Sequence, residues 1–254
     1  MCVGVFALFH HARLNSRLAA LETASDFNMA FEQGTWMPQI FHRRSNTIAR
    51  TSIVAAGLFI LLAGWGLYAV YWSPYTTLVQ VPLHQPIPFS HKHHTGELGI
   101  DCRYCHTSVE KSAFAGLPAT ETCMTCHSQL YNTAPILAPA RESLATDTPL
   151  RWQRVNYVPD FVFFNHSIHV NKGIGCANCH GQVEDMPLMA KGETLYMKFC
   201  LGCHDHPEKF IRPRNQVFNL KWLPPANQAE QGPKLVKDYN VNTTQMSDCS
   251  MCHR

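Results

Sequence analysis

The sequence predicts a mainly helical chain with extensive irregular coil, made of one transmembrane helix and a larger domain organised around bound cofactors. Three observations lead to this expectation. Residues 52–72 carry no charged side chain, the motif C-x-x-C-H occurs five times after them, and the connecting segments are rich in proline and amides. The formal net charge of +3 argues against a nucleic-acid-binding protein, which would concentrate basic residues on one surface.

Residues 1–50 are expected to form a cytoplasmic segment. The stretch "LNSRLAALETASDFNMAFEQ" has the pattern of a short amphipathic helix. Met37 opens "MPQIFHRRSN" and would make a natural start, so whether residues 1–36 belong to the native chain is left open. Cys2 is the one cysteine outside a motif, and we interpret it as a free thiol.

Residues 51–73 are expected to cross the membrane once. At ~1.5 Å per residue, 21 uncharged residues span ~31 Å, which matches the hydrocarbon core of a bilayer. Tyr71, Trp72 and Tyr75 suit the interfacial aromatic belt at one end. A buried core helix or a cleaved signal are alternatives, but the length and the lack of an A-x-A-like site favour a retained span. Arginines precede it and no Lys or Arg follows until Lys92, which predicts a cytoplasmic N-terminus and an exported domain.

The exported domain, residues 74–254, holds five copies of C-x-x-C-H, where chance predicts roughly 0.03 copies. This motif attaches c-type haem: two thiols become thioethers and the histidine becomes the proximal iron ligand. Zinc and iron–sulfur sites are the alternatives, but neither requires a histidine directly after the second cysteine. The sequence therefore predicts five covalent haem c groups and, because attachment occurs outside the bacterial cytoplasm, a periplasmic domain. The predicted attachment residues are Cys102, Cys105, Cys123, Cys126, Cys176, Cys179, Cys200, Cys203, Cys249 and Cys252, and the predicted proximal ligands are His106, His127, His180, His204 and His253.

An internal repeat organises this domain. Residues 89–127 and 164–204 each read F-x-H-x-x-H, then C-x-x-C-H, a "VE" pair and a second C-x-x-C-H, and the fifth motif follows at 249–253. Residues three apart on a helix lie on adjacent faces of one turn, so the two histidines of each pair can bind two different irons. The predicted distal ligands are His91, His94, His166 and His169. We expect short helices at the motifs, long irregular connections and almost no sheet around a core that is largely porphyrin.

Five six-coordinate irons need ten axial ligands, and these histidines supply nine. The candidates for the tenth are Met186, Met189, Met197, His84, His93 and His206. We favour Met186 or Met197, one of the two at most, because the first repeat lacks a methionine at either place. A His/Met haem would have a higher reduction potential than its His/His neighbours, whereas an open fifth site is the alternative. With every iron saturated, the chain would have no catalytic residue and would move electrons only.

A resemblance to a known family covers roughly residues 37–254 and rests on the segments "MPQIFHRRSNTIARTSI", "CHGQVEDM" and "YMKFCLGCHDHPEKFIRP", together with the span and the five motifs. The family that these residues resemble is that of the pentahaem membrane-anchored cytochrome c subunits of alternative complex III. The resemblance implies an electron-transfer subunit that is no enzyme on its own within a quinol-oxidising respiratory or photosynthetic complex. Its implied partners are an iron–sulfur subunit, quinol-binding integral subunits, a monohaem cytochrome c and a periplasmic acceptor such as a cytochrome c or copper protein.

Two other functions remain open. A self-sufficient membrane-anchored quinol dehydrogenase, which feeds a periplasmic reductase, also combines one span with C-x-x-C-H motifs and would need a labile ligand near the membrane. A multihaem reductase would need an iron open to its substrate. A high-spin signal in electron paramagnetic resonance (EPR) would favour either one, and an all low-spin spectrum the electron-transfer subunit. Which distal histidine serves which haem, the haem potentials and the terminal acceptor do not follow from the sequence.

Overall fold

The structure, a computed structural model, describes residues 41–253. The described residues divide into two units, 41–66 and 67–253. The expected amphipathic helix before residue 34, Met37 and Cys2 lie outside the described residues.

Helix α2, Ser45–Tyr71, is the one described helix that is long and apolar enough to cross a membrane. Its 27 residues extend ~40 Å, its mean hydropathy reaches 2.2, and none of its side chains is buried. The helix ends where proline follows, since the residue before proline is forced into extended backbone. Ser73 accordingly has ψ 157°, and the short α3, Pro74–Thr77, begins a new turn that Leu78 closes with φ 57°.

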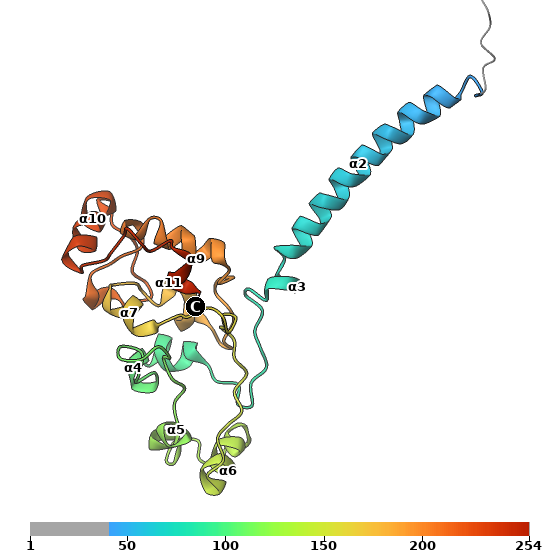
Figure 1. Ribbon diagram of the computed structural model, residues 1–254. Coiled ribbons are helices and arrows are strands. Elements are labelled where there is room, and N and C mark those ends of the chain that lie inside the picture. The colour runs from blue at the N-terminus through green and yellow to red at the C-terminus, as the bar shows by residue number, and fades with distance from the viewer. Residues whose placement is uncertain (1–40, 254) are drawn as a thin grey trace, which may run out of the picture. The chain divides into compact units, whose positions relative to one another are not determined.

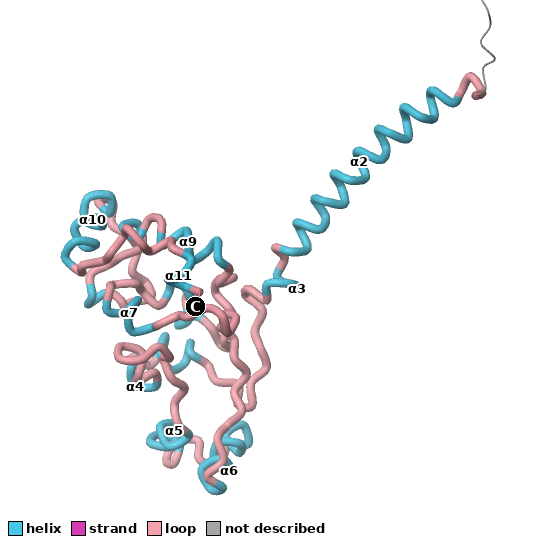
Figure 2. Tube along the Cα trace, viewed as in Figure 1, coloured by secondary structure: helices cyan, strands magenta, loops and turns pink. Residues whose placement is uncertain are grey.

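The second unit consists of short helices joined by coil, as Figures 1 and 2 show. No β-strand forms between residues 67 and 253, and four isolated bridges, such as Ile174 to Ile211, are its only sheet-like pairing. The prediction of a mainly helical fold with extensive irregular coil is confirmed. The helices are η1 (Lys92–Glu97), α4 (Cys102–Cys105), α5 (Thr120–His127), η2 (Pro135–Leu137), α6 (Ala138–Thr146), α7 (His166–Asn171), α8 (Ala177–His180), η3 (Val183–Asp185), α9 (Met197–His204), η4 (Pro207–Lys209), η5 (Arg214–Gln216), α10 (Gln228–Asp238) and α11 (Cys249–Cys252).

The two repeats fold alike except for one extra residue in the first. His91 lies eleven residues before Cys102, whereas His166 lies ten before Cys176. The first repeat absorbs the extra residue as a π-helix, η1, where the second has the α-helix α7. The closing hydrogen bond shifts by one residue to match: Ile100 N–H donates to the His94 carbonyl, and Ile174 N–H to the His169 carbonyl. The histidines therefore keep equivalent places although the spacing differs.

The polypeptide core of this unit is very small. Eight hydrophobic residues are buried in the described part, and the central cluster is Val109, Val170 and Val217 with Ala115 and Phe218 beside it. Ordering a backbone costs about 1–2 kcal/mol per residue, which so few buried side chains cannot offset over roughly 180 residues. Large apolar side chains such as Phe114 and Phe161 are instead mostly exposed. A core of this size fits a domain whose interior is completed by large cofactors.

Candidate haem sites

Each C-x-x-C-H motif forms one helical turn. The histidine N–H donates to the carbonyl of the first cysteine at 2.8 Å in motif 102–106, 3.0 Å in 176–180 and 2.9 Å in 249–253. In α5 and α9 the motif makes the last turn of an eight-residue helix. Residues four apart share one helix face, so the turn presents a thiol and an imidazole to the same side.

The motif cysteines remain separate thiols. None of the ten forms a disulfide in the described part of the chain. Burial raises the pKa of Cys176 and Cys203 to about 11 and that of Cys179 to about 12. The four ligands of a structural zinc ion must converge on one point. Between residues 41 and 253 no three His, Cys, Asp or Glu side chains converge in this way.

The distal and proximal histidines meet in pairs. Two imidazoles on opposite sides of one metal, with bonds of about 2 Å and a ring radius of about 1.2 Å, have centroids roughly 6.4 Å apart. Three pairs in the structure match this spacing, each joining one F-x-H-x-x-H histidine to one motif histidine. The centroid separations are 6.1 Å for His94 and His127, 6.3 Å for His166 and His180, and 6.3 Å for His169 and His204.

The pKa values of His91 and His180 show which charged groups are near each ring. Burial lowers the pKa of His91 to about 4, and His106 is the largest of the charges that lower it further. Burial likewise lowers the pKa of His180 to about 4, with His166 the foremost neighbouring charge. Both rings are thus kept as neutral imidazole, the form that binds metal. In the second repeat the first histidine therefore meets the first motif and the second histidine the second motif, and in the first repeat His94 meets the second motif. His106 is the foremost charged neighbour of His91.

Backbone carbonyls fix the orientation of six of these rings. A carbonyl can only accept, so the Nδ1 atom that contacts it carries the proton and Nε2 keeps its free electron pair. Such a bond is the usual outer support of a metal-binding histidine. The Nδ1–carbonyl pairs are His94–Ser90 (2.8 Å), His106–Gly116 (2.7 Å), His127–Leu130 (3.1 Å), His166–Ala113 (2.8 Å), His169–Asn165 (2.7 Å) and His204–Met246 (2.7 Å).

The phenylalanine of F-x-H-x-x-H packs on both histidines of its segment, a role that the motif spacing alone did not reveal. Phe164 stacks on His169 at 4.5 Å and meets His166 edge-on at 4.7 Å. Phe89 does the same in the first repeat, at 4.3 Å from His94 and 4.9 Å from His91. The apolar ring restricts both imidazoles to one rotamer each. The recurrence of Phe at this position in both repeats was the available signal.

The fifth motif differs from the others. The ring near His253 is Phe161, with centroids 5.7 Å apart, and the Phe163 N–H donates to the Cys252 carbonyl at 2.8 Å. No contact in the described residues joins His253 to a candidate for the tenth ligand. Met186 lies beside Gly181, next to the third motif, and Met197 is 58% exposed at the start of α9. The tenth ligand stays a prediction.

Three of the remaining candidates for that ligand have other contacts. Acidic residues accept from two imidazoles: His93 contacts Glu97 at 2.9 Å and His206 contacts Glu208 at 3.4 Å. The Met189 carbonyl accepts from the Leu83 N–H at 3.4 Å.

The motifs lie in a definite spatial order. Burial is the main cause that raises the thiol pKa values, and a thiol of a neighbouring motif adds to it in four cases. Because charge effects weaken with distance, these cases identify adjacent motifs. They link Cys105 to Cys123, Cys176 to Cys102, Cys179 to Cys203, and Cys200 to Cys252. Numbered along the chain, the second motif therefore lies near the first, the first near the third, the third near the fourth, and the fourth near the fifth.

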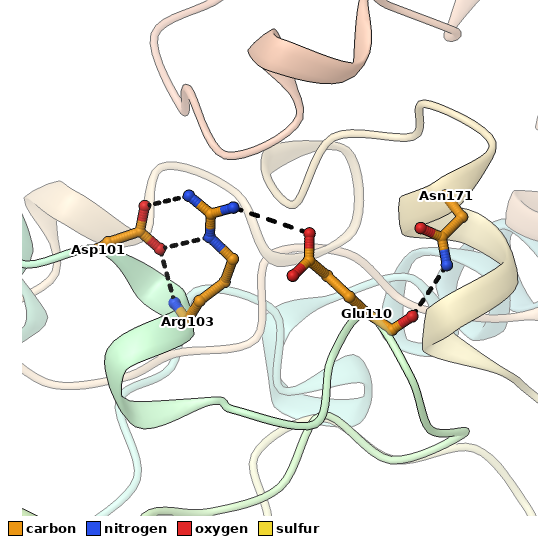
Figure 3. A network of polar contacts seen from close by, with 4 residues as sticks. All are labelled: Asp101, Arg103, Glu110 and Asn171. Atoms are coloured by element: carbon orange, nitrogen blue, oxygen red, sulfur yellow. Dashed lines mark hydrogen bonds and ion pairs between the residues drawn. The ribbon is translucent and has the colours of Figure 1, made fainter.

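A polar network joins the two repeats (Figure 3). The Arg103 guanidinium donates to Asp101 at 2.8 and 2.9 Å and lies 3.7 Å from Glu110, while Asp101 also caps α4. The Asn171 side chain at the end of α7 donates to the Glu110 carbonyl at 2.9 Å. The first and third motifs are thereby kept next to each other.

Comparison with known proteins identifies the class of domain that this chain contains. The family model "Cytochrome c7 and related cytochrome c" matches residues 162–254, and the "Class III cytochrome C family" model matches residues 73–138. A curated relative, "Menaquinone reductase, multiheme cytochrome c subunit" of Nitratidesulfovibrio vulgaris, is 36% identical over 110 residues. The matched part covers 43% of this chain and 51% of the relative, so the chain spans about half the length of that protein. The chain therefore contains multihaem cytochrome c domains and is homologous, over part of its length, to the cytochrome subunit of a menaquinone reductase.

Proposed function

We propose that this chain is the electron-transfer subunit of a membrane quinol:acceptor oxidoreductase of the alternative complex III type, and that it carries five haem c groups. The observation that supports this best is the set of facing imidazoles at 6.1–6.3 Å, the spacing of two axial ligands on one iron. Each haem supplies a one-electron couple between ferric and ferrous iron.

The pairs of imidazoles define the ligand sets. In the first repeat His91 and His106 hold one iron, and His94 and His127 hold another. In the second repeat the equivalent pairs are His166 with His180 and His169 with His204. His253 binds the fifth iron, with Met186 or Met197, one of them at most, as the proposed tenth ligand. Such saturated sites leave no position for a substrate, which is why we propose that the chain is no enzyme by itself.

In this proposal the neighbouring motifs form one unbranched series of sites. The second motif, Cys123–His127, is at one end of the series, and the fifth, Cys249–His253, is at the other. Electrons exchanged with partners would pass most directly through these two ends. The polypeptide serves this role by fixing six of the rings with a carbonyl and by packing a phenylalanine on each distal pair, so that little reorganises when the charge changes.

Helix α2 anchors the chain in the membrane in this proposal. Arg43, Arg44 and Arg50 before the apolar segment would stay in the cytoplasm, and the haem domain would be periplasmic. The partners are those of the complex: an iron–sulfur subunit, quinol-binding integral subunits, a monohaem cytochrome c and a soluble periplasmic acceptor.

A second candidate function is supported by the name of the relative. That protein belongs to a menaquinone reductase, so electrons would move into quinone instead of out of quinol. A series of His/His sites does not itself set the direction. The self-sufficient quinol dehydrogenase differs from both, because it would need a labile ligand. Among the five sites only the fifth has an unassigned ligand.

The test uses the full chain purified with its haems. Mass spectrometry should show the added mass of five haems, and the EPR spectrum should be low-spin throughout. Menaquinol added to the isolated chain should not reduce the haems rapidly, whereas the complete complex should reduce them. Rapid reduction of the isolated chain would overturn this proposal in favour of a self-sufficient dehydrogenase, and fewer than five haem masses would remove at least one motif from it.

A further inference from the structure

Arg212 is a buried cation that packs against the third motif. It is only 3% exposed, and its guanidinium lies so close to Gly175 that a Cβ there would overlap it. It donates to the Asn178 side chain, inside the motif, and to the Asn219 carbonyl at 3.2 Å. The Trp222 ring covers it with the centroid 4.3 Å away. The charge is therefore held rigidly beside the backbone that opens "CANCH".

Nothing in the described part of the chain neutralises this charge. Arg212 forms no ion pair with an acidic residue, and its Nε–H is buried without an acceptor. A cavity of about 240 Å³ beside it is lined by no acidic residue and by a second cation, Lys209. Burial lowers the pKa of Arg212, and the charge of the Cys176 thiol raises it. That thiol no longer ionises once it has become a thioether. Guanidinium stays protonated in proteins, so the charge persists.

The corresponding cation of the first motif is compensated. Arg103 has two acidic partners, Asp101 and Glu110, and its side chain is about half exposed. Both motifs have a pair of histidines, so their axial ligands do not distinguish them. The two motifs differ instead in their cations. Arg212 is buried without an acidic partner, whereas Arg103 is half exposed and has two acidic partners. Reduction of an iron lowers its positive charge, and a fixed cation nearby favours the reduced state.

We propose that Arg212 is a tuning residue that raises the reduction potential of the haem at Cys176–His180 above that of the haem at Cys102–His106. This inference rests on the proposed haem ligation of the third motif. It gives the higher potential of these two neighbouring haems to the one in the second repeat. A purely structural role, in which Arg212 only supports the loop, is the competing explanation.

Three variants separate charge from support. Arg212→Gln removes the charge, and Arg212→Lys keeps it while losing the forked hydrogen bonds. Asn178→Asp places a carboxylate on the guanidinium without changing shape, so it neutralises Arg212 and leaves the packing in place. Lys221→Gln is the matched control, since it removes one positive charge from an exposed side chain next to Trp222.

The experiment is a redox titration of the full, haem-loaded chain, resolved into five components. His166→Ala first identifies the component of the third motif by its conversion to high spin. At an effective dielectric of ~20, a desolvated unit charge near the haem shifts the equilibrium on the order of tenfold, which is about 59 mV for one electron. Arg212→Gln and Asn178→Asp should lower that component by this amount and leave the other four in place. Arg212→Lys and Lys221→Gln should change the redox equilibrium constant of that component less than twofold.

If Arg212→Gln does not retain the haem, Asn178→Asp decides the matter. An unchanged component in Asn178→Asp, or an equal loss in Arg212→Lys and Arg212→Gln, would overturn the tuning role and leave a structural one. A wild-type chain with no haem on the third motif fails differently, because it contradicts the proposed function itself.

Discussion

Replacing His166 by alanine removes one imidazole from the pair that it forms with His180. Their ring centroids are 6.3 Å apart and their planes differ by only 7°, and this separation fits two imidazoles that bind one iron. Alanine leaves no atom that can bind the iron, so under the proposed ligation one of the five irons would lose a ligand. One fifth of the haem should therefore change from low to high spin.

The rest of the domain should tolerate this change. The substitution also removes the hydrogen bond from His166 Nδ1 to the Ala113 carbonyl, which contributes about 0.5–1.5 kcal/mol. The attachment residues Cys176 and Cys179 are untouched, so the variant should retain all five haems. The result then reports ligation and not haem loss.

The assay is quantitative EPR on the purified variant, with haem counted by mass. His93→Ala is the matched control because His93 lies in the same kind of segment but is exposed and paired with Glu97. It should leave every iron low-spin. A low-spin spectrum from His166→Ala with five haems retained would refute the pairing, and a high-spin signal from His93→Ala would reassign the distal ligands.

Three further predictions concern attachment, packing and the tenth ligand. Replacing both Cys176 and Cys179 by serine should lower the mass by one haem and no more; a loss of two haems would show that the sites do not load independently. Gly192→Ala should destabilise the chain by about 1–3 kcal/mol, or roughly 2–4 °C per kcal/mol in a thermal melt, because the new Cβ would overlap the backbone of His180 and Gly181. Gly202→Ala should have little effect, since the other four motifs carry a side chain at that position, and equal melting temperatures for the two variants would contradict the packing argument. Met186→Leu or Met197→Leu should abolish the near-infrared band of a Met–iron bond and lower the highest potential, and if neither does so the fifth iron has another ligand.

Periodic features of the sequence predicted the architecture of this chain well. Residues 52–71 of the apolar run became part of α2, and the motifs became single helical turns joined by coil. These features depend on local chemistry, which is visible residue by residue. The extra residue between His94 and Cys102 was also visible in the sequence. The motif pattern alone did not indicate that the chain would absorb it as the π-helix η1.

Long-range features were not predictable in this way. The partner of each distal histidine depends on how a turn packs against a helix from another part of the chain, and spacing alone allowed several pairings. Arg212 lies eight residues after His204 and was not singled out, because nothing in its neighbourhood of the sequence indicates that it reaches Asn178. Its burial depends on Gly175 and Trp222, which lie far from each other along the chain.

The order of the motifs in space follows from how the two repeats meet. Each repeat places its own two motifs side by side, so two copies could join through any of four combinations of motifs. The contact actually formed joins α4 of the first repeat to α7 of the second, through Arg103, Glu110 and Asn171, and the His166 ring is held by the Ala113 carbonyl of the first repeat. This contact makes the first and third motifs neighbours and leaves the second motif at an end. The fifth motif then extends the series beyond the fourth, because Cys252 lies near Cys200. An interface between repeats, and not the sequence order of the motifs, therefore determines which sites are terminal.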